Sequence, residues 1–150
     1  MIGPGTGIAP MRALLQERSH MKHKLKLPVG SNLLYFGCKK RKLDYIYQNE
    51  IEKFQKSGDI HKLRLAFSRD QSKKVYVQHL VEEDADLVWD MVEKKGAYIY
   101  ICGGIQMGHD VCAALRNIAV QKGGLKNDDD AKHYLDGLHE QGRLVQELWA

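Results

Sequence analysis

Short apolar runs, each followed by a segment with helical periodicity, constrain the fold of this chain more than any other feature. Three runs, Asn32–Cys38, Leu63–Phe67 and Ala97–Cys102, are almost continuously apolar, which is typical of parallel strands buried on both faces. The segments between them carry apolar residues at helical spacing. Strands and helices that alternate in this way predict an α/β fold built on a parallel sheet.

The helical segments have recognisable ends. Pro10 falls where the first turn of a helix tolerates proline, Gly58 suits the position after a helix C-terminus, and the run Asp128–Asp130 suits a helix N-terminus. We therefore expect four helices and a final strand, over Ile8 to about Lys24, Tyr45–Lys56, Met107 to about Gly123, Asn127 onward, and Arg143–Trp149.

The chain opens on a glycine-rich segment, Gly3-Pro4-Gly5-Thr6-Gly7, with only Met1 and Ile2 before it. In a strand-loop-helix unit such a segment follows a buried parallel strand. We therefore expect Ile2 to be the remainder of a first strand and the chain to be truncated within that strand. With this strand counted, the expected fold is a three-layer, doubly wound parallel sheet of about five strands.

The glycine-rich segment suits an anionic ligand. Backbone N–H groups of such a loop can approach phosphate oxygens, and the helix that follows adds about half a positive charge at its N-terminus. The segment lacks both the Gly-Lys-Ser/Thr of a P-loop and the GxGxxG spacing of the dinucleotide fingerprint. On glycine content alone, a diphosphate site and a tight structural turn are equally good interpretations.

Composition narrows the class of protein. A length of 150 residues with 43% hydrophobic content suits a single domain, which we expect to span residues 1–150. Three cysteines without a CxxC pair argue against a disulfide framework, and no His or Cys spacing suits zinc, so we expect no metal. No apolar run reaches the roughly 20 residues of a membrane span, so we expect no membrane contact by this part. The basic run Lys39-Lys40-Arg41-Lys42 lacks the aromatic residues of a nucleic-acid site and is interpreted as a solvated loop.

Five blocks along the chain resemble the NADPH-binding domain of the diflavin reductases, within the ferredoxin-NADP reductase superfamily. The first is the glycine-rich segment with its continuation Ile8-Ala9-Pro10. The others follow in order at matching spacing, with a terminal Trp149 after them: Leu34–Cys38, Ala66–Gln71, Val75–His79 and Tyr100–Gly103. The resemblance covers essentially the whole chain, and it implies that the glycine-rich segment holds the pyrophosphate of NADPH.

Side chains after the third strand bear on which dinucleotide is bound. Ser68 and Arg69 would lie beside the adenosine ribose, and Lys74 and Tyr76 follow a short turn later. A hydroxyl, a guanidinium, an ammonium and an aromatic ring suit a 2′-phosphate, whereas NAD would favour an acid on the ribose. The resemblance therefore implies NADP(H), with Gln78 as a further contact. A solvated basic turn is the alternative.

The resemblance also assigns residues at the nicotinamide end. It implies that Cys102, Glu147 and Trp149 line the slot in which hydride passes from nicotinamide to FAD, with Trp149 covering the flavin until nicotinamide displaces it. Three residues would frame the nicotinamide or its ribose as a second glycine turn: Gly103, Gly104 and Met107. Two positions depart from the family, which commonly has aspartate in place of Glu147 and an acid in place of Gly104. Without the resemblance, Cys102 would be interpreted as a core residue and Trp149 as a frayed terminus.

The resemblance implies a larger parent protein, an NADPH-dependent oxidoreductase whose FAD and FMN domains lie outside this chain. Electrons would pass from FAD through FMN to a protein acceptor such as a cytochrome or an iron-sulfur protein, and the fragment would not turn over alone. The expected location is the cytoplasm, or the cytoplasmic face of the endoplasmic reticulum if the parent has an anchor. The competing hypothesis is a regulatory module that senses NADPH without redox chemistry, for which Trp149 would have no use.

Overall fold

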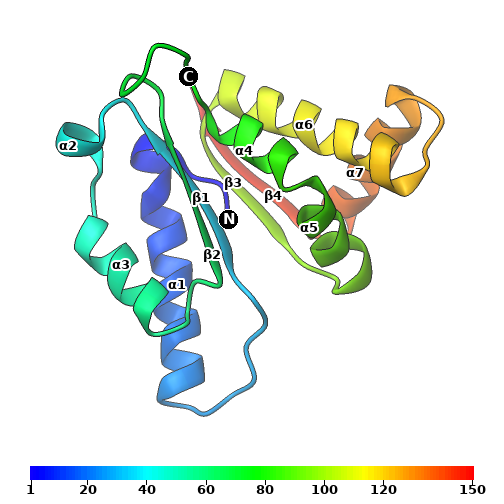
Figure 1. Cartoon of the computed structure of the whole chain (residues 1–150). Coiled ribbons are helices and arrows are strands. Elements are labelled where there is room, and N and C mark those ends of the chain that lie inside the picture. The colour runs from blue at the N-terminus through cyan, green and yellow to red at the C-terminus, as the bar shows by residue number, and fades with distance from the viewer. The chain divides into compact units, whose positions relative to one another are not determined.

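The computed structural model describes every residue, Met1–Ala150, in two compact units. The N-terminal unit comprises Met1–Tyr76 and the C-terminal unit comprises Val77–Ala150. Each unit contains a pair of parallel strands with helices packed on it (Figure 1). The predicted α/β class with parallel strands is therefore confirmed.

The strands of the N-terminal unit are β1 (Leu33–Cys38) and β2 (Lys62–Phe67), which pair in parallel. Ile2 forms an isolated parallel bridge to Tyr35 in β1, and the Gly3 N–H donates to the Tyr35 carbonyl at 3.0 Å. The first strand predicted at Ile2 is thus present as a short pairing beside β1. β1 is buried along most of its length, as expected for a parallel strand.

The helices of this unit begin with η1 (Gly5–Gly7), a single 3-10 turn that leads directly into α1 (Ile8–His23). Ile8, Met11 and Leu15 are fully buried along one face of α1, because residues three and four apart share a helix face. The prediction of a helix from Ile8 to about Lys24 is confirmed to within a residue.

The segment between β1 and β2 differs from the prediction at its start. The basic run, interpreted from sequence as a solvated loop, forms part of a short helix, α2 (Arg41–Asp44), and α3 (Gln48–Lys56) begins three residues later than expected. The delay arises at Tyr47, whose backbone is left-handed (φ 57°), a conformation that a right-handed helix excludes. Gly58 has φ 76° just beyond α3, as predicted for a residue that ends a helix.

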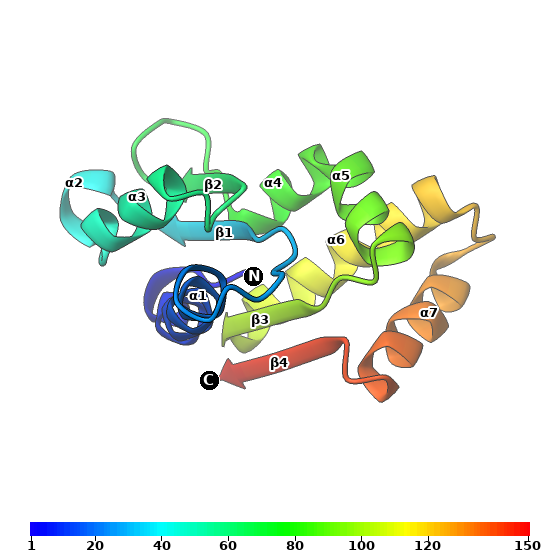
Figure 2. The same ribbon diagram turned by 90° about the horizontal axis from the view of Figure 1, so that it is seen from below.

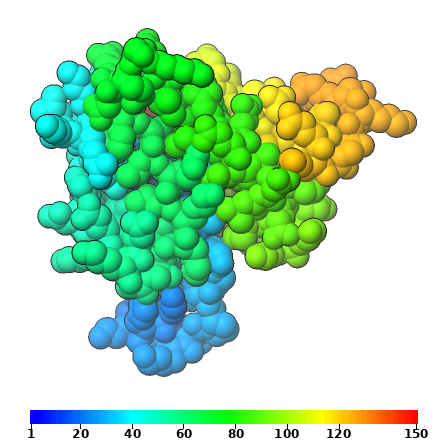
Figure 3. All heavy atoms as spheres, viewed as in Figure 1, coloured from blue at the N-terminus to red at the C-terminus, as the bar shows by residue number.

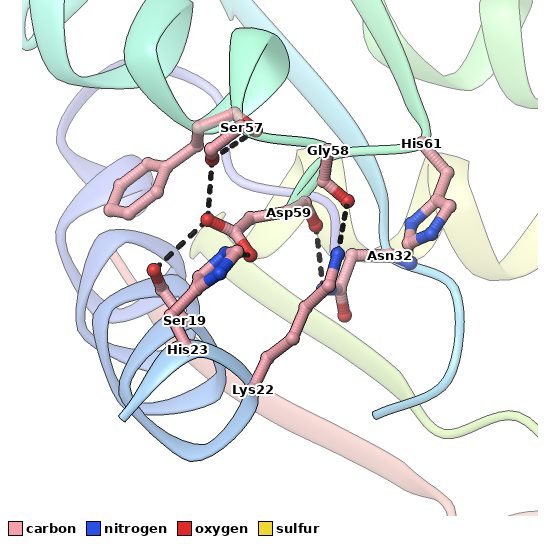
Figure 4. Close-up of polar contacts among 9 residues, drawn as sticks. Ser19, Lys22, His23, Asn32, Ser57, Gly58, Asp59 and His61 are labelled. Atoms are coloured by element: carbon pink, nitrogen blue, oxygen red, sulfur yellow. Dashed lines mark hydrogen bonds and ion pairs between the residues drawn. The ribbon is translucent and has the colours of Figure 1, made fainter. Parts of the chain in front are cut away.

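A polar cluster holds α1 to the turn between α3 and β2 (Figure 4). The buried carboxylate of Asp59 accepts hydrogen bonds from Ser19 (2.9 Å) and Ser57 (2.5 Å) and pairs with His23 (2.9 Å). Beside it, the Asn32 side chain donates to the Asp59 carbonyl at 2.7 Å. Burial alone would raise the pKa of Asp59, but the hydrogen bonds outweigh burial and hold that pKa below its ordinary value.

The C-terminal unit begins with three short helices that the sequence did not indicate. They are α4 (Val77–Glu83), α5 (Ala85–Trp89) and η2 (Asp90–Lys94), of which the last is a π-helical turn. Each is seven residues or shorter, so none fills the window of about 11–18 residues over which helical periodicity is recognised in a sequence.

The strands of the C-terminal unit are β3 (Ile99–Gly104) and β4 (Leu144–Trp149), which pair in parallel. β3 continues through Gly103-Gly104, and the next helix begins at once. The prediction of a second glycine turn at these two residues is therefore wrong: they are the last residues of a strand that stays paired with β4 to its end.

Two longer helices pack on this strand pair. α6 (Ile105–Gly123) contacts both strands, and α7 (Asp128–Glu140) contacts β4 and α6 (Figure 2). The approach of α6 to β4 is close, because a Cβ added to Gly108 would lie 2.5 Å from a methyl carbon of Leu148. α7 begins as predicted, with the Asn127 side chain accepting a hydrogen bond from the Asp130 N–H (2.9 Å). None of the helices combines the length and the hydropathy that a membrane span requires.

Candidate functional site

The glycine-rich segment forms a tight loop at the carboxyl edge of the N-terminal strand pair. A Cβ on Gly3 would lie 2.8 Å from the carbonyl carbon of Gly7 and 2.9 Å from the Met11 side chain, so only glycine fits there. Gly5 has φ 58° with open space around it, a backbone conformation that also favours glycine. The loop closes through a hydrogen bond from the Gly7 N–H to the Pro4 carbonyl (3.0 Å).

This loop presents backbone donors to solvent. Gly5 and Thr6 are exposed, and as the first residues of a helical turn their N–H groups have no acceptor within that turn. The turn passes directly into α1, whose N-terminus carries partial positive charge. Exposed amides at a helix start are suited to an anion such as a phosphate.

Arg12, in the first half of α1 and close to the glycine loop in sequence, is already engaged within the protein. Its guanidinium donates to both carboxylate oxygens of Glu50 in α3, at 2.7 and 2.8 Å, and lies 4.6 Å from the centre of the Tyr47 ring. These hydrogen bonds raise the pKa of Arg12 and lower the pKa of Glu50. Arg12 therefore holds the first half of α1 against α3.

The second predicted group follows β2 in the same unit. The N–H groups of Ser68 and Arg69 donate to the carbonyls of Cys38 (2.9 Å) and Lys39 (2.8 Å), which ties the turn after β2 to the end of β1. Because carboxyl ends of neighbouring parallel strands meet at one edge of a sheet, these residues share an edge with the glycine loop. The loop from 68 to 76, green in Figures 1 and 3, forms part of the surface.

The cationic side chains of this loop face solvent. Arg69 and Lys74 are exposed, Ser68 is half-buried, and Tyr76 at the end of the loop is 41% exposed. A guanidinium, an ammonium, a hydroxyl and a phenol are thus carried on one short surface loop. Such a set can bind a phosphate monoester through charge-assisted hydrogen bonds.

Contacts that the sequence did not indicate fix the shape of this loop. The Gln71 side-chain amide donates to the carbonyls of Phe67 (2.5 Å) and Lys73 (2.9 Å). Asp70 accepts a hydrogen bond from the Arg41 N–H (3.1 Å) and so ties the loop to α2. Sequence spacing gives no signal for either contact, since both depend on how the loop folds back on itself.

The C-terminal unit carries the other predicted residues. Cys102 in β3 lies directly opposite Glu147 in β4, and Gly104 lies opposite Trp149 two residues further along. Residues two apart in a strand point to the same face, so Cys102, Glu147 and Trp149 share one face at the carboxyl end of this pair. The structure thus places the three side chains on one face, and the role that the resemblance implies for them stays a prediction.

The environments of these three side chains differ. Cys102 is 3% exposed, whereas Glu147 is exposed and Trp149 is 43% exposed. Burial raises the pKa of the Cys102 thiol, and the negative charge of Glu147 raises it further. The thiol therefore stays protonated at neutral pH, and it has none of the thiolate character of a nucleophilic cysteine.

The structure places the remaining predicted residues of this unit, but no side-chain hydrogen bond or ion pair joins them. Gly103 is buried and Gly104 half-buried at the end of β3, and Met107 is half-buried in the first turn of α6. Gln78 is half-buried in the first turn of α4. Their assignment to a ligand stays a prediction.

Comparison with known proteins identifies the chain's relatives. It is 45% identical to the NADPH–cytochrome P450 reductase of Drosophila melanogaster, 42% identical to that of Musca domestica and 40% identical to that of Cavia porcellus. Each alignment covers 100% of this chain but only 22% of the relative. The chain therefore spans about a fifth of the length of the relatives it matches.

A family model gives the corresponding assignment for the domain. The model of the oxidoreductase NAD-binding domain matches residues 1–113, which include the glycine loop, both strands of the N-terminal unit and the cationic loop. Together with identities of 40% and above across the whole chain, this match leaves one conclusion. The chain belongs to the oxidoreductase NAD-binding domain family.

Proposed function

We propose that residues 1–150 form the NADPH-binding domain of a diflavin oxidoreductase of the NADPH–cytochrome P450 reductase kind. The observation that carries this proposal is the placement of two features at one edge of the β1–β2 pair. Exposed amides of the glycine loop suit a diphosphate, and the cations after β2 suit a phosphate on the adenosine ribose. The names of the relatives support the same cofactor.

The glycine loop supports the diphosphate half of the proposal. Gly3 is required by its contact with the Gly7 carbonyl group, and Gly5 by its positive φ. Both positions therefore need glycine for the loop to keep this shape. Pro4 and Thr6, which lie beside these glycines in the loop, are the other residues of the proposed diphosphate site.

The cationic loop supports NADP(H) over NAD(H). Arg69 and Lys74 would bind the 2′-phosphate, with Ser68 donating a hydroxyl and Tyr76 and Gln78 flanking the adenosine end. An acid on the ribose would instead favour NAD(H). The acid that follows Arg69 in sequence, Asp70, accepts a hydrogen bond from the Arg41 N–H.

The C-terminal unit would serve the nicotinamide end. The charge at the nicotinamide becomes more positive as hydride leaves, and the Glu147 carboxylate would stabilise that charge. The neutral Cys102 thiol would fill space beside it, Trp149 would act as a movable cover, and Gly103, Gly104 and Met107 would frame the ring or its ribose. FAD, when bound, supplies the atom that accepts the hydride.

The larger assembly is part of the same proposal. An FAD domain of the same polypeptide would receive the hydride, and an FMN domain would pass electrons to an acceptor protein such as a cytochrome or an iron-sulfur protein. Three unpaired cysteines support a reducing compartment, which we infer to be the cytoplasm or, if the parent is anchored, the cytoplasmic face of the endoplasmic reticulum.

Calorimetric titration of the chain with NADP⁺ and with NAD⁺ tests the cofactor assignment. Two charge-assisted contacts to the 2′-phosphate predict at least about tenfold tighter binding of NADP⁺. Arg69→Ala should remove most of this preference, whereas Lys126→Ala, at an exposed lysine of the C-terminal unit, should leave it unchanged. Equal affinities of the unchanged chain for the two dinucleotides would overturn the proposal.

A further inference from the structure

The loop between β2 and α4 contains an internal clamp made by one neutral side chain. Gln71 donates from a single nitrogen to the carbonyl of Phe67, where β2 ends, at 2.5 Å, and to the carbonyl of Lys73 at 2.9 Å. The clamp therefore spans the loop and joins the residue before Ser68 to the residue before Lys74.

Both ends of the clamp lead to groups of the proposed phosphate site. Ser68 and Arg69 follow Phe67 directly, and Lys74 follows Lys73 directly. The start of the loop is fixed independently, because the N–H groups of Ser68 and Arg69 are bound to β1 and the residue after it. No backbone–backbone hydrogen bond holds Lys73 or Lys74, and the Gln71 amide ties the Lys73 carbonyl to the strand end.

We propose that Gln71 is a positioning residue that sets the preference for a 2′-phosphorylated dinucleotide by holding Arg69 and Lys74 at a fixed separation. The inference rests on the proposed function and deepens it. Gln71 need not touch the ligand; it acts through the backbone of the residues that do.

The chemistry of the loop explains why such a clamp is needed. Arg69, Lys73 and Lys74 are all exposed cations within six residues, and like charges at this spacing repel one another. Without a restraint the loop would open, and its ordering would then oppose phosphate binding. Glutamine suits the task because its amide donates two hydrogen bonds to carbonyl oxygens and adds no charge.

Gln71→Met tests the inference, because methionine has a similar length but no hydrogen-bond donor. Loss of the clamp should cost about the net free energy of one neutral hydrogen bond, which predicts about threefold to tenfold weaker binding of NADP⁺. Binding of NAD⁺, which lacks the 2′-phosphate, should stay unchanged. Gln55→Met, at an exposed glutamine of α3, is the matched control and should change neither affinity.

A second variant and a spectroscopic signal separate positioning from general stabilisation. Gln71→Asn keeps the amide on a shorter arm and should lose only part of the NADP⁺ affinity. The ³¹P resonance of the bound 2′-phosphate should shift toward its free position in Gln71→Met, while the diphosphate resonances stay in place.

The outcomes of this experiment are distinguishable from those of the first. If the unchanged chain prefers NADP⁺ but Gln71→Met keeps the full preference, the positioning role is overturned and the proposed function stands. If Gln71→Met weakens NADP⁺ and NAD⁺ equally, the clamp supports the fold and does not set specificity. If the unchanged chain shows no preference at all, the proposed function itself fails.

Discussion

Gly3→Ala is the substitution whose effect on the glycine loop can be worked out most directly. The added methyl group would lie 2.8 Å from the Gly7 carbonyl carbon and closer still to its oxygen. Real Cβ atoms essentially never approach a heavy atom within 3.0 Å. The contact is with backbone, so the loop must shift. Gly7 is the N-cap residue of α1, so this shift reaches the start of the helix.

Gly3→Ala should change both the folding stability and the NADP⁺ affinity, through two separate effects. Overpacking at a tight site costs about 1–3 kcal/mol of folding free energy. A displacement of a few tenths of an ångström also moves the amides that face the diphosphate. Loss of one amide hydrogen bond to a charged phosphate costs about 1.5–3 kcal/mol, so we expect NADP⁺ binding to weaken by about tenfold or more.

Two matched glycines separate these effects. Gly5 and Gly96 both have positive φ, 58° and 64°, and both have open space around them. Alanine at either position should cost about 1 kcal/mol through its left-handed backbone. Gly5→Ala should also weaken NADP⁺, since its methyl group enters the proposed diphosphate space, whereas Gly96→Ala should leave binding unchanged.

The assay combines urea unfolding followed by circular dichroism with calorimetric titration of NADP⁺. The reasoning predicts that Gly3→Ala and Gly5→Ala lose affinity while Gly96→Ala loses stability alone. A Gly3→Ala variant that binds NADP⁺ like the unchanged chain would refute the placement of the diphosphate on this loop. Equal loss of affinity in all three variants would show that binding follows stability only.

Three further predictions concern stability, each measured by urea unfolding. The pKa of Asp59 is lowered in the fold, so its carboxylate stabilises the protein above the unfolded pKa of about 3.9, and this stability is lost as pH falls through the folded value. Asp59→Asn should therefore lower the free energy of unfolding at neutral pH by about 1–3 kcal/mol and make it depend less on acid pH. Tyr45→Phe should leave stability unchanged or raise it by about 1 kcal/mol, because the buried hydroxyl of Tyr45 has no hydrogen-bond partner. Gly108→Ala should destabilise by about 1 kcal/mol or more because its methyl group meets Leu148, whereas Gly137→Ala, with open space in α7, should stabilise by up to about 1 kcal/mol.

The elements predicted well from sequence are those in which local signals agree. α1 has a proline in its first turn, a buried face at helical spacing and a glycine loop before it, and its bounds match the prediction to within a residue. α7 has an Asn127 cap and an acidic first turn, and it begins where expected. In both cases the information lies within a few neighbouring residues.

The elements that the sequence did not indicate depend on tertiary contacts. The helices between Val77 and Lys94 are each too short to fill the window over which helical periodicity is recognised. The left-handed backbone of Tyr47, which delays α3, is accompanied by stacking of the Arg12 guanidinium on the Tyr47 ring. Gly103-Gly104 resembles a turn in sequence but pairs with Leu148 and Trp149 in β4. Glycine alone does not distinguish a turn from a strand end that a neighbour approaches closely.

The candidate site divides along the same line. The residue types of the proposed phosphate site were evident in the sequence, because glycine, arginine and lysine are residues that commonly bind phosphate. The geometry of the candidate site as a whole was not evident, because the Gln71 hydrogen bonds and the pairing of Cys102 with Glu147 join residues through the folded backbone. Sequence resemblance supplied Cys102 and Glu147 as a pair, but only the strand register places them on one face.

The charges of the two units support different parts of one proposed reaction. A phosphate carries its negative charge throughout, so under the proposed function the cations of the N-terminal unit would stabilise substrate and transition state alike and would contribute to binding. The nicotinamide becomes more positive only as hydride leaves, so under the proposed function the Glu147 carboxylate would stabilise that later state selectively and would contribute to rate. A neutral Cys102 thiol is consistent with this division, because a second negative charge beside Glu147 would be repelled. The raised pKa of the thiol reflects burial first and this repulsion second.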